Sequence, residues 1–247
     1  MDAPVVLVTG AGKRVGAAIA ETLHDRGWRV LLHVRRDTAP AQVFADRLNG
    51  MRPDSARVLQ GDLADRSALL RVADEAVAAW GHLEGLVNNA SSFYPTAIGE
   101  TTDAHWDDLF ASNARGPFFL TQALAPALRA SGRGAIVNLV DIHAEFPLAG
   151  HTVYCMAKAA LVAMTKSLAK ELAPAVRVNG VAPGAILWPE GSGEMSATLQ
   201  QEILATVPLG RIGGAQAIAD AVSFLVAGSD YVSGQILAVD GGRSVWG

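Results

Sequence analysis

The chain has 247 residues, half of them apolar, and a formal net charge of −4. A chain of this length can form one α/β unit with a single large core, so we expect one domain spanning residues 1–247. The charges are dispersed without a basic stripe, which argues against nucleic acid as a partner.

The sequence carries no pattern typical of export, membrane insertion or metal binding. It begins MDAPVVLVTG, without a basic segment, and nowhere are there about 18 consecutive apolar residues. Cys155 is the single cysteine, and the six histidines are scattered without a ligand spacing. We therefore expect a cytoplasmic protein with no membrane partner, no internal disulfide and no metal site.

Short apolar runs rich in valine and leucine alternate with longer segments of helical period, as in a parallel sheet covered on both faces. Leu, Val and Ala recur every three or four residues in Ser67 to Trp80 and Val153 to Ala173, which predicts helices there. Right-handed crossovers then give an α/β fold, a Rossmann-type doubly wound sheet of seven parallel strands. The predicted strands are Val5 to Thr9, Arg29 to Val34, Arg57 to Gln60, Gly85 to Asn89, Ala135 to Val140, Arg177 to Ala182 and Gln235 to Val239.

A glycine-rich turn follows the first predicted strand. Residues 9 to 16 read T-G-A-G-K-R-V-G and lead into a helical pattern. Glycines at such a turn let the backbone approach a pyrophosphate, whose charge is favoured by the amides and the dipole at the helix start. The alternative is an ordinary tight turn that needs positive φ at Gly10 or Gly12.

Basic residues gather around this turn and the end of the second predicted strand: Lys13, Arg14, His33, Arg35 and Arg36. An acidic residue at that strand end would bond the ribose hydroxyls of NAD, whereas arginine suits a 2′-phosphate. We therefore predict NADPH or NADP as the cofactor. A solvated charged loop at Arg35 and Arg36 is the alternative.

The most informative pattern joins Asp141, Tyr154 and Lys158. Residues four apart share a helix face, so the Lys158 ammonium is expected near the Tyr154 phenol, where it favours the ionised form. Lowering a phenol pKa from about 10 towards 7 takes roughly 4 kcal/mol, which requires a semi-buried site with additional positive charge. A carboxylate at Asp141 opposes ionisation, so Tyr154 is expected to act mainly as an acid. The alternative role for Asp141 is a simple cap after its strand.

These motifs resemble the short-chain dehydrogenase/reductase family from Thr9 to Gly184, and the D-G-G at Asp240 to Gly242 is similar to the usual family ending. In that family a serine normally stands where Asp141 stands. The resemblance also implies that Asn113, in a predicted helix, bends or hydrates that helix and links the lysine to a proton relay. The implied catalytic residues are Asp141, Tyr154, Lys158 and Asn113.

The same resemblance implies cofactor contacts along the chain. It places Asp62 and Leu63 at the adenine, and Pro183 and Gly184 beside the nicotinamide. Each of these has a plainer alternative as a cap, a turn or a buried amide. The implied cofactor-binding residues are Gly10, Lys13, Arg14, Val15, His33, Arg35, Arg36, Asp62, Leu63, Asn89, Ala90, Ser91, Tyr154, Lys158, Pro183 and Gly184.

Three departures from the family pattern occur together: Arg14 and Ser91 replace glycine, and Asp141 replaces serine. An ionised carboxylate only accepts hydrogen bonds and repels the oxyanion of ketone reduction, so Asp141 favours a substrate with N–H donors or a ring nitrogen. The alternative is an Asp141 carboxyl that its surroundings hold protonated. The combination resembles pteridine reductases, as does the run N-N-A-S-S-F-Y-P from Asn88 to Pro95. This resemblance implies a pterin ring stacked between the nicotinamide and Phe93. The predicted substrate-binding residues are Arg14, Ser91, Phe93, Asp141, Tyr154 and Trp188.

Residues 185–200 follow the sixth predicted strand and contain a run rich in Gly, Pro and Ser, Ala185 to Ser196. Ligands of such sheets bind at the carboxyl ends of the strands, so we expect this segment to form a mobile substrate lid. Trp188 is the candidate for closing over the ligand. An ordinary surface excursion is the alternative.

The sequence therefore predicts an NADPH-dependent pteridine reductase, which transfers hydride to a C=N bond of a pterin or dihydropterin and has dihydrofolate as a secondary substrate. Two alternatives stay open: a carbonyl reductase of the 3-oxoacyl type, and a non-catalytic NADPH-sensing or scaffold protein. The family resemblance also implies a homotetramer built through the helices near Trp106 to Ala130 and Val153 to Ala173.

Overall fold

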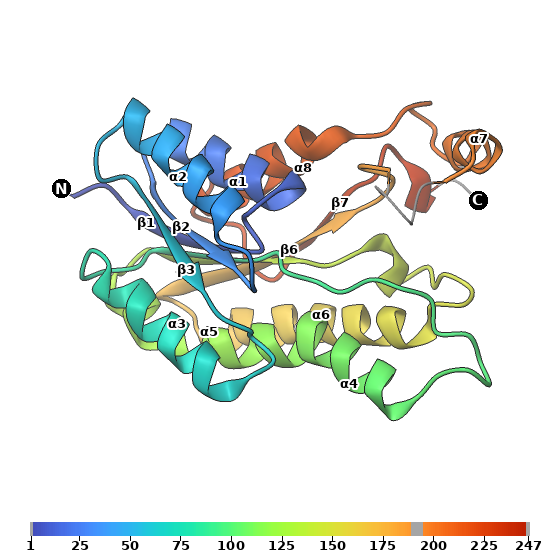
Figure 1. The fold of residues 1–247 in the computed structure, drawn as a ribbon, viewed down its shortest axis with the longest axis horizontal. Helices are drawn as coiled ribbons and strands as arrows, with labels where there is room; N and C mark the ends of the chain where they lie inside the picture. Colours follow the sequence, from blue (N-terminus) through green and yellow to red (C-terminus); the bar gives the residue numbers. More distant parts are fainter. Residues whose placement is uncertain (1, 189–194, 246–247) are drawn as a thin grey trace.

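The structure is a computed structural model that describes residues 2–188 and 195–245. Seven parallel strands form one sheet in the order β3-β2-β1-β4-β5-β6-β7 (Figure 1). Strand order reverses between β1 and β4, which opens a crevice at the carboxyl ends of the strands. The predicted Rossmann-type sheet is confirmed. Its strands are β1 (Val5–Thr9), β2 (Arg29–Val34), β3 (Ala56–Gln60), β4 (Gly85–Asn88), β5 (Gly134–Leu139), β6 (Val176–Pro183) and β7 (Ile236–Val239).

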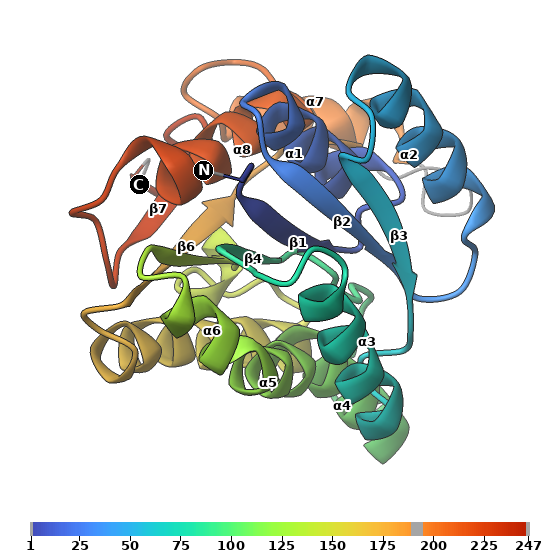
Figure 2. The ribbon, with the colours of Figure 1, turned by 90° about the vertical axis from the view of Figure 1, so that its left-hand side faces the viewer.

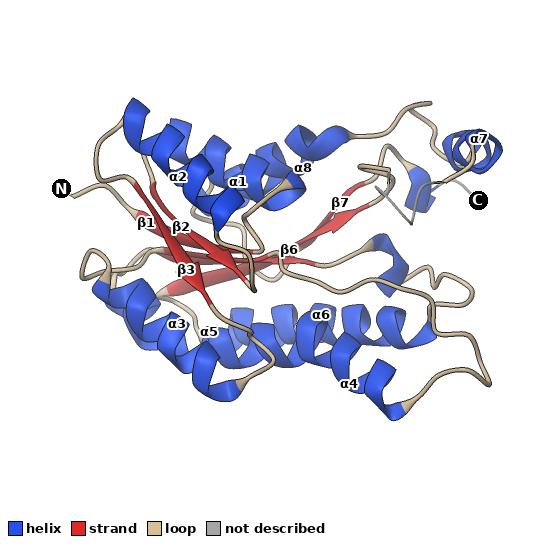
Figure 3. Ribbon diagram, viewed as in Figure 1, coloured by secondary structure: helices blue, strands red, loops and turns tan. Residues whose placement is uncertain are grey.

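Helices cover both faces of the sheet, as Figure 2 and Figure 3 show. One layer holds α1 (Arg14–Asp25), α2 (Ala39–Met51) and α8 (Gly214–Ser223), and the other holds α3 (Arg66–Ala78), α5 (Gly116–Ala130) and α6 (Thr152–Glu171). Two short helices, α4 (Asp103–Phe110) and α7 (Ala197–Ala205), lie towards one end of the molecule (Figure 1). None of the described helices has the length and apolar character needed to cross a bilayer.

Alternating side chains of the strands fill two separate hydrophobic cores. In β1, Val6 and Val8 pack with Ile19 of α1, whereas Val5 and Leu7 belong to the core under α3, α5 and α6. This follows from the two-residue period of a strand, and it explains why strands covered on both faces are continuously apolar. Full burial of each such side chain contributes about 1.5–3 kcal/mol, so the sheet is a rigid base for the crevice.

The predicted bounds match the observed ones for β1 and β2 and differ by one or two residues for the other predicted elements. The strand β4 ends at Asn88, because the backbone N–H of Asn89 leaves the ladder and donates to Thr9 Oγ1 at 2.9 Å. Helix α6 ends at Glu171 rather than at Ala173, since Pro174 disfavours helical backbone in the residue before it. Helix α3 likewise ends at Ala78 rather than Trp80.

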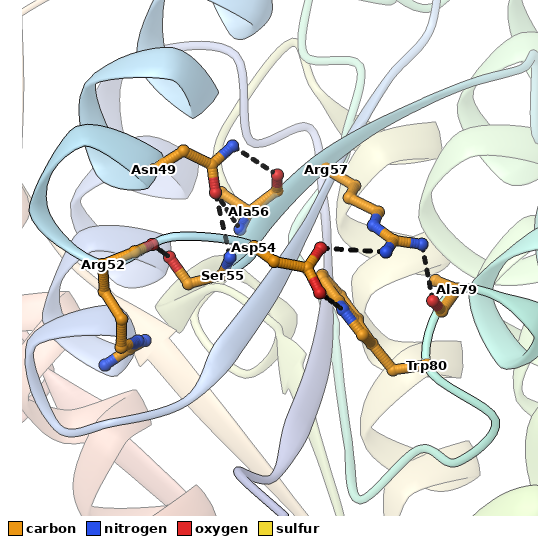
Figure 4. A network of polar contacts seen from close by, with 8 residues as sticks. All are labelled: Asn49, Arg52, Asp54, Ser55, Ala56, Arg57, Ala79 and Trp80. Atoms are coloured by element: carbon orange, nitrogen blue, oxygen red, sulfur yellow. Dashed lines mark hydrogen bonds and ion pairs between the residues drawn. The ribbon is translucent and has the colours of Figure 1, made fainter.

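A polar network ties the start of β3 to its neighbours, as Figure 4 shows. The Asn49 side chain accepts from the backbone N–H groups of Ser55 and Ala56, and donates to the Ala56 carbonyl at 2.9 Å. Asp54 accepts from Arg57 at 2.9 Å and from the Trp80 indole at 3.0 Å. These contacts fix the α2–β3 turn and so the position of the sheet edge.

The helical segment predicted near Trp106 to Ala130 contains an irregularity. Between α4 and α5, residues Ala111–Arg115 form one turn of π-helix, with Asn113 at its centre. Such bulges are rare and occur frequently at functional sites. The bulge widens the helix where it passes the crevice.

The predicted lid is only partly described. Residues 189–194 lie outside the described residues, and the lid prediction for them stays a prediction. The last part of 185–200 is helical, because the Ser196 side chain caps α7 by accepting from Leu199 N at 3.2 Å.

Candidate active site

The carboxyl ends of the strands enclose a cavity of about 960 Å³. Four of the predicted site residues lie off its wall. Lys158 and Asn113 are buried behind the wall, Arg36 is exposed outside it, and Pro183 ends β6. The predicted residues on the wall are Gly10, Lys13, Arg14, Val15, His33, Arg35, Asp62, Leu63, Asn89, Ala90, Ser91, Phe93, Asp141, Tyr154, Gly184 and Trp188.

The glycine-rich turn is shaped to admit a ligand close to the backbone. Gly10 has a φ of +65°, in the left-handed region that favours glycine. A Cβ atom at Gly16 would lie 2.2 Å from the Gly10 carbonyl oxygen, so only glycine fits there. The first turn of α1 therefore meets β1 with its N–H groups unobstructed, which suits a pyrophosphate.

Thr9 and Asn89 hold this turn in place. The Asn89 side chain donates to the carbonyls of Thr9 at 2.8 Å and Gly10 at 3.2 Å, while Ala90 N donates to Thr9 Oγ1 at 3.0 Å. Asn89 thus acts as a support for the turn, across the switch point between β1 and β4. Thr9 was not among the predicted site residues, although it stands directly before the glycines.

Arg14 combines an unusual backbone with a contact to the opposite wall. Its φ of +54° lies in the left-handed region, which explains why the family pattern has glycine at this position. Its guanidinium donates to the Trp188 carbonyl at 3.0 Å. Arg14 therefore connects the glycine-rich turn to the segment after β6.

His33 lines the cavity but adds no cation to it, contrary to its place in the predicted basic cluster. It accepts at Nδ1 from Gly10 N at 3.4 Å and lies 2.9 Å from the Gly61 carbonyl at Nε2. These partners fit a neutral ring that donates from Nε2. Burial lowers the pKa of His33, against the weaker opposing effects of Gly61 and Asp62.

Arg35 is the basic residue that lines the cavity at the end of β2. Its Nε donates to Asp62 Oδ2 at 2.8 Å, and both side chains are partly exposed. Asp62 also accepts from Ala64 N at 3.0 Å through Oδ1. The pair orients the Arg35 fork and leaves its terminal nitrogens without a partner among the described residues.

A buried ladder of side-chain hydrogen bonds fixes α6 against the sheet. Asn88 donates to Asn138 Oδ1 at 2.8 Å, and Asn138 donates to Thr165 Oγ1 at 2.8 Å. These residues belong to β4, β5 and α6 and are fully buried, so each bond is costly to break. These hydrogen bonds fix the position of α6 along the sheet, and α6 carries Tyr154 and Lys158.

Asp141 and Tyr154 form the central contact of the cavity. The Tyr154 hydroxyl donates to Asp141 Oδ2 at 2.7 Å, and Asp141 Oδ1 accepts from His143 N at 2.8 Å. Asp141 therefore does cap the short helix Ile142–Ala144, as the plainer alternative held, while also binding the tyrosine. Lys158 lies one turn further along α6, and its Nζ donates to the Leu139 carbonyl at 2.7 Å.

The Tyr154 phenol is harder to ionise than an ordinary tyrosine. Burial raises its pKa well above 10.0, and the charge and hydrogen bond of Asp141 raise it further. The predicted lowering by Lys158 is wrong here, because that ammonium lies 5.7 Å from the ring centroid and points to Leu139. Burial lowers the pKa of Lys158 to about 8, with Asp141 opposing the shift.

Asn113 lies in the π-helical turn with one unsatisfied oxygen. Its side-chain nitrogen donates to the carbonyls of Leu109 at 2.9 Å and Ser92 at 3.0 Å. Its Oδ1 is buried and accepts no hydrogen bond from the described residues. A water molecule bonded there would satisfy it, as the hydration role implied by the family resemblance requires.

Phe93 presents a half-exposed ring to the cavity. It stacks on His151 with the centroids 4.7 Å apart, and it meets the Tyr154 ring edge-on at 4.8 Å. His151 thus supports one face of Phe93 and was missed by the sequence analysis. Its signal was weak, since a histidine before a helix has many structural uses.

The wall nearest β7 and α7 was not predicted. It contains Leu199 and Ile203, which are four residues apart on α7, and Arg243, which follows β7. Only the folded sheet brings these segments to the same cavity as Asp141.

Among the described residues, no group of three or more His, Cys, Asp or Glu side chains is arranged to hold a metal ion.

The shifted pKa of Lys158 predicts a pH-dependent effect on stability. Between about pH 8 and pH 10.5 the unfolded chain binds more protons than the folded one, because the pKa of Lys158 is lower in the folded state. The free-energy cost of burying the ammonium therefore has its full value below pH 8 and decreases as pH rises above 8. Lys158→Met removes that cost. Its free energy of unfolding relative to wild type should fall by about 2 kcal/mol between about pH 7 and pH 9.5.

Denaturant unfolding at both pH values measures this difference. Lys166→Met, an exposed lysine on the same helix, is the matched control and should show no such trend. A pH-independent difference for Lys158→Met would mean that Lys158 is not buried as a titrating ammonium.

Comparisons with known proteins agree with this geometry. A family model described as enoyl-(acyl carrier protein) reductase matches residues 10–244. The chain is 40% identical to "Pteridine reductase 1" of Leishmania tarentolae, across 98% of this chain and 97% of that protein. It is 34% identical to an uncharacterized oxidoreductase, YmfI, of Bacillus subtilis (strain 168), across 96% and 97%. It is 33% identical to a 3-oxoacyl-(acyl-carrier-protein) reductase, FabG, of Escherichia coli (strain K12), across 98% and 97%.

These similarities extend over nearly the whole chain, and the relatives are oxidoreductases by name. The sheet, the glycine-rich turn and the Tyr154–Lys158 pair agree with them. The protein is thus an oxidoreductase that uses a nicotinamide cofactor and acts on a small molecule. It belongs to the short-chain dehydrogenase/reductase family.

Proposed function

We propose that the protein is an NADPH-dependent pteridine reductase that reduces a C=N bond of a pterin or dihydropterin to the tetrahydro form. The observation that carries this proposal is the 2.7 Å hydrogen bond from the Tyr154 hydroxyl to Asp141 Oδ2. Similarity to "Pteridine reductase 1" of Leishmania tarentolae supports it. Similarity to a 3-oxoacyl reductase keeps carbonyl reduction as the second candidate.

The carboxylate of Asp141 selects for donors on the substrate. Each of its oxygens accepts one hydrogen bond within the protein and has capacity for another towards the cavity. A pterin offers N–H groups on its ring edge that match such an acceptor. A 3-oxoacyl group offers carbonyl oxygens, which a carboxylate repels, and the repulsion grows as negative charge develops.

Protonation by Tyr154 fits reduction of a C=N bond. Bound NADPH supplies the hydride. The ring nitrogen gains an electron pair as hydride adds to the neighbouring carbon, so it can take a proton from a phenol that is still protonated at neutral pH. Tyr154 is therefore the proton donor, Asp141 accepts from its hydroxyl and fixes its position, and Lys158 is held one turn further along α6 by the Leu139 carbonyl.

Phe93 completes the substrate side of the proposal. Its half-exposed ring is braced by His151 and lies against Tyr154, which presents a flat apolar surface beside the polar pair. A planar heteroaromatic ring gains stacking contact there without ordering a new side chain. An aliphatic acyl chain gains less from such a surface.

Replacing Asp141 with the usual serine tests the substrate assignment. Asp141→Ser should lower kcat/KM for 7,8-dihydrobiopterin about 100-fold, because it removes the acceptor for the pterin edge and the anchor of Tyr154. Activity on a 3-oxoacyl thioester should rise in the same variant. Steady-state kinetics with both substrates measures this change in substrate preference. Asp107→Ser, which removes an exposed carboxylate on α4, is the control.

Two outcomes decide between the candidates. A wild-type protein that reduces the thioester but no pterin would identify a carbonyl reductase. Tight NADPH binding without turnover of either substrate would instead indicate the non-catalytic sensing or scaffold role. The hydroxyl of Tyr154 on the wall of the cavity, with Lys158 one helical turn away, speaks against that role.

The preference for NADPH rests on Arg35. Its guanidinium lines the cavity at the end of β2, where a 2′-phosphate on the adenosine ribose would lie in this fold. Asp62 holds Nε and so aims the two terminal nitrogens for bidentate bonding. Lys13 adds a second positive charge to the same wall.

Removing this guanidinium should weaken discrimination between the two cofactors. Arg35→Gln should lower the ratio of kcat/KM for NADPH to that for NADH about tenfold, which corresponds to one lost charged hydrogen bond. Kinetics with each cofactor at a fixed substrate concentration gives the ratio. Arg26→Gln, an exposed arginine outside the cavity, controls for net charge, and an unaltered ratio in Arg35→Gln would remove Arg35 from cofactor selection.

Assembly into a homotetramer is also proposed. The exposed apolar side chains Trp106, Phe118 and Met156 lie on α4, α5 and α6, the helices that the family resemblance implies as subunit contacts. Covering them with further copies of the chain would remove apolar surface from water.

A further inference from the structure

His33 is a buried histidine at the end of β2, beside the residues that open the glycine-rich turn. Its side chain is 2% exposed. Across the ladder it is the partner of Thr9 in β1, and its carbonyl accepts from Ala11 N at 2.9 Å. Its ring accepts from Gly10 N. One residue therefore contacts each of the three residues Thr9, Gly10 and Ala11.

The peptide unit that joins Thr9 to Gly10 is held at both of its polar ends. Its carbonyl oxygen, on Thr9, accepts from the Asn89 side chain at 2.8 Å, and its N–H, on Gly10, donates to His33 Nδ1 at 3.4 Å. A peptide unit is planar, so two bonds at its opposite ends fix its rotation. Glycine places few steric limits on its own backbone, and this orientation therefore depends on the two partners.

The Gly61 carbonyl determines which nitrogen of His33 carries the proton. Nε2 lies 2.9 Å from that oxygen, which accepts hydrogen bonds and cannot donate them, so Nε2 is protonated and Nδ1 is the acceptor. Gly61 is itself fixed, because its N–H donates to the Val34 carbonyl at 3.1 Å. The end of β3 is thus connected through the imidazole ring to the glycine-rich turn.

A protonated ring could not hold the peptide in this way. A proton on Nδ1 would set one N–H group against the N–H of Gly10 and would remove its acceptor. Burial disfavours the cation and lowers the pKa of His33, although Gly61 and Asp62 oppose the shift. Lys13 and Arg35, which line the same cavity, are cations and do not favour a further positive charge. The neutral ring therefore keeps Nδ1 free to accept from Gly10.

We propose that His33 is a positioning residue for the cofactor, and that its Nδ1 sets the orientation of the Thr9–Gly10 peptide and so of the turn that faces the pyrophosphate. Its role is to orient backbone, whereas Arg35 supplies charge. NAD and NADP share the pyrophosphate, so His33 should affect the binding of both equally. The inference rests on the use of a nicotinamide cofactor and does not depend on which substrate is reduced.

Two substitutions separate the two bonds of the ring. An asparagine amide reaches the position of Nδ1, whereas a glutamine amide reaches the position of Nε2. His33→Asn therefore keeps an acceptor for Gly10 N, and His33→Gln keeps a donor to the Gly61 carbonyl. Calorimetric titration at about pH 7.5 should give His33→Asn an affinity for NADP within about threefold of wild type. His33→Gln should bind NADP about tenfold more weakly, and NAD weaker by the same factor.

The two variants control for each other, because both lose the imidazole ring and its packing. Thermal unfolding of the cofactor-free variants should give similar Tm values, so a difference in affinity reports the contact with Gly10. NMR of wild type labelled at the histidine ring nitrogens gives an independent readout, with His33→Asn to assign the resonances. At neutral pH it should show a protonated Nε2 and an unprotonated Nδ1 for His33.

Three results would overturn the inference. The first is an equal affinity for NADP in the two variants, and the second is a protonated Nδ1 in wild type. The third is a changed ratio of NADP to NAD affinity in His33→Gln, which would mean that His33 acts at the 2′-phosphate. None of these results bears on pterin reduction, which is tested separately by turnover of 7,8-dihydrobiopterin in wild type.

Discussion

The hydrogen bond between Tyr154 and Asp141 is the contact on which the chemistry of the cavity depends. It joins the end of β5 to the first turn of α6, and it puts a carboxylate beside the phenol that must move a proton. Burial and this carboxylate raise the pKa of Tyr154 together, so the hydroxyl keeps its proton at neutral pH. The site is thereby suited to proton donation rather than to proton abstraction.

The rest of the fold fixes the position of this contact relative to the sheet. The ladder through Asn138 and Thr165 sets α6 against β5, and Lys158 is anchored to the Leu139 carbonyl in the same layer. On the other side of the switch point, Asn89 supports the glycine-rich turn. The rigid sheet thus places the glycine-rich turn and the Tyr154–Asp141 pair on the wall of one cavity.

Local patterns were enough to predict the fold and much of the cavity wall. The two-residue period of the strands and the glycines of residues 9–16 depend directly on local backbone geometry, so both are visible in the sequence. Arg14 stands where the family pattern has glycine, and it adopts the left-handed φ that glycine favours. The state of His33 was not predictable, because its burial and tautomer depend on Gly10 and Gly61. The position of Arg243 was not predictable either, since only the pairing of β6 with β7 brings it to the cavity. The raised pKa of Tyr154 comes first from burial and then from Asp141, and the depth of burial of a single side chain is not readable from residue spacing.

The ionisation of Tyr154 tests the central claim most directly. NMR of tyrosine labelled at Cζ follows each of the three tyrosines, with Tyr154→Phe to assign the resonance and the 99% exposed Tyr231 as a reference in the same sample. The Tyr154 signal should not titrate below about pH 10 in nucleotide-free wild type, and its pKa should fall in Asp141→Ser. Titration of Tyr154 near neutral pH in the wild type would show a phenolate site and contradict the account.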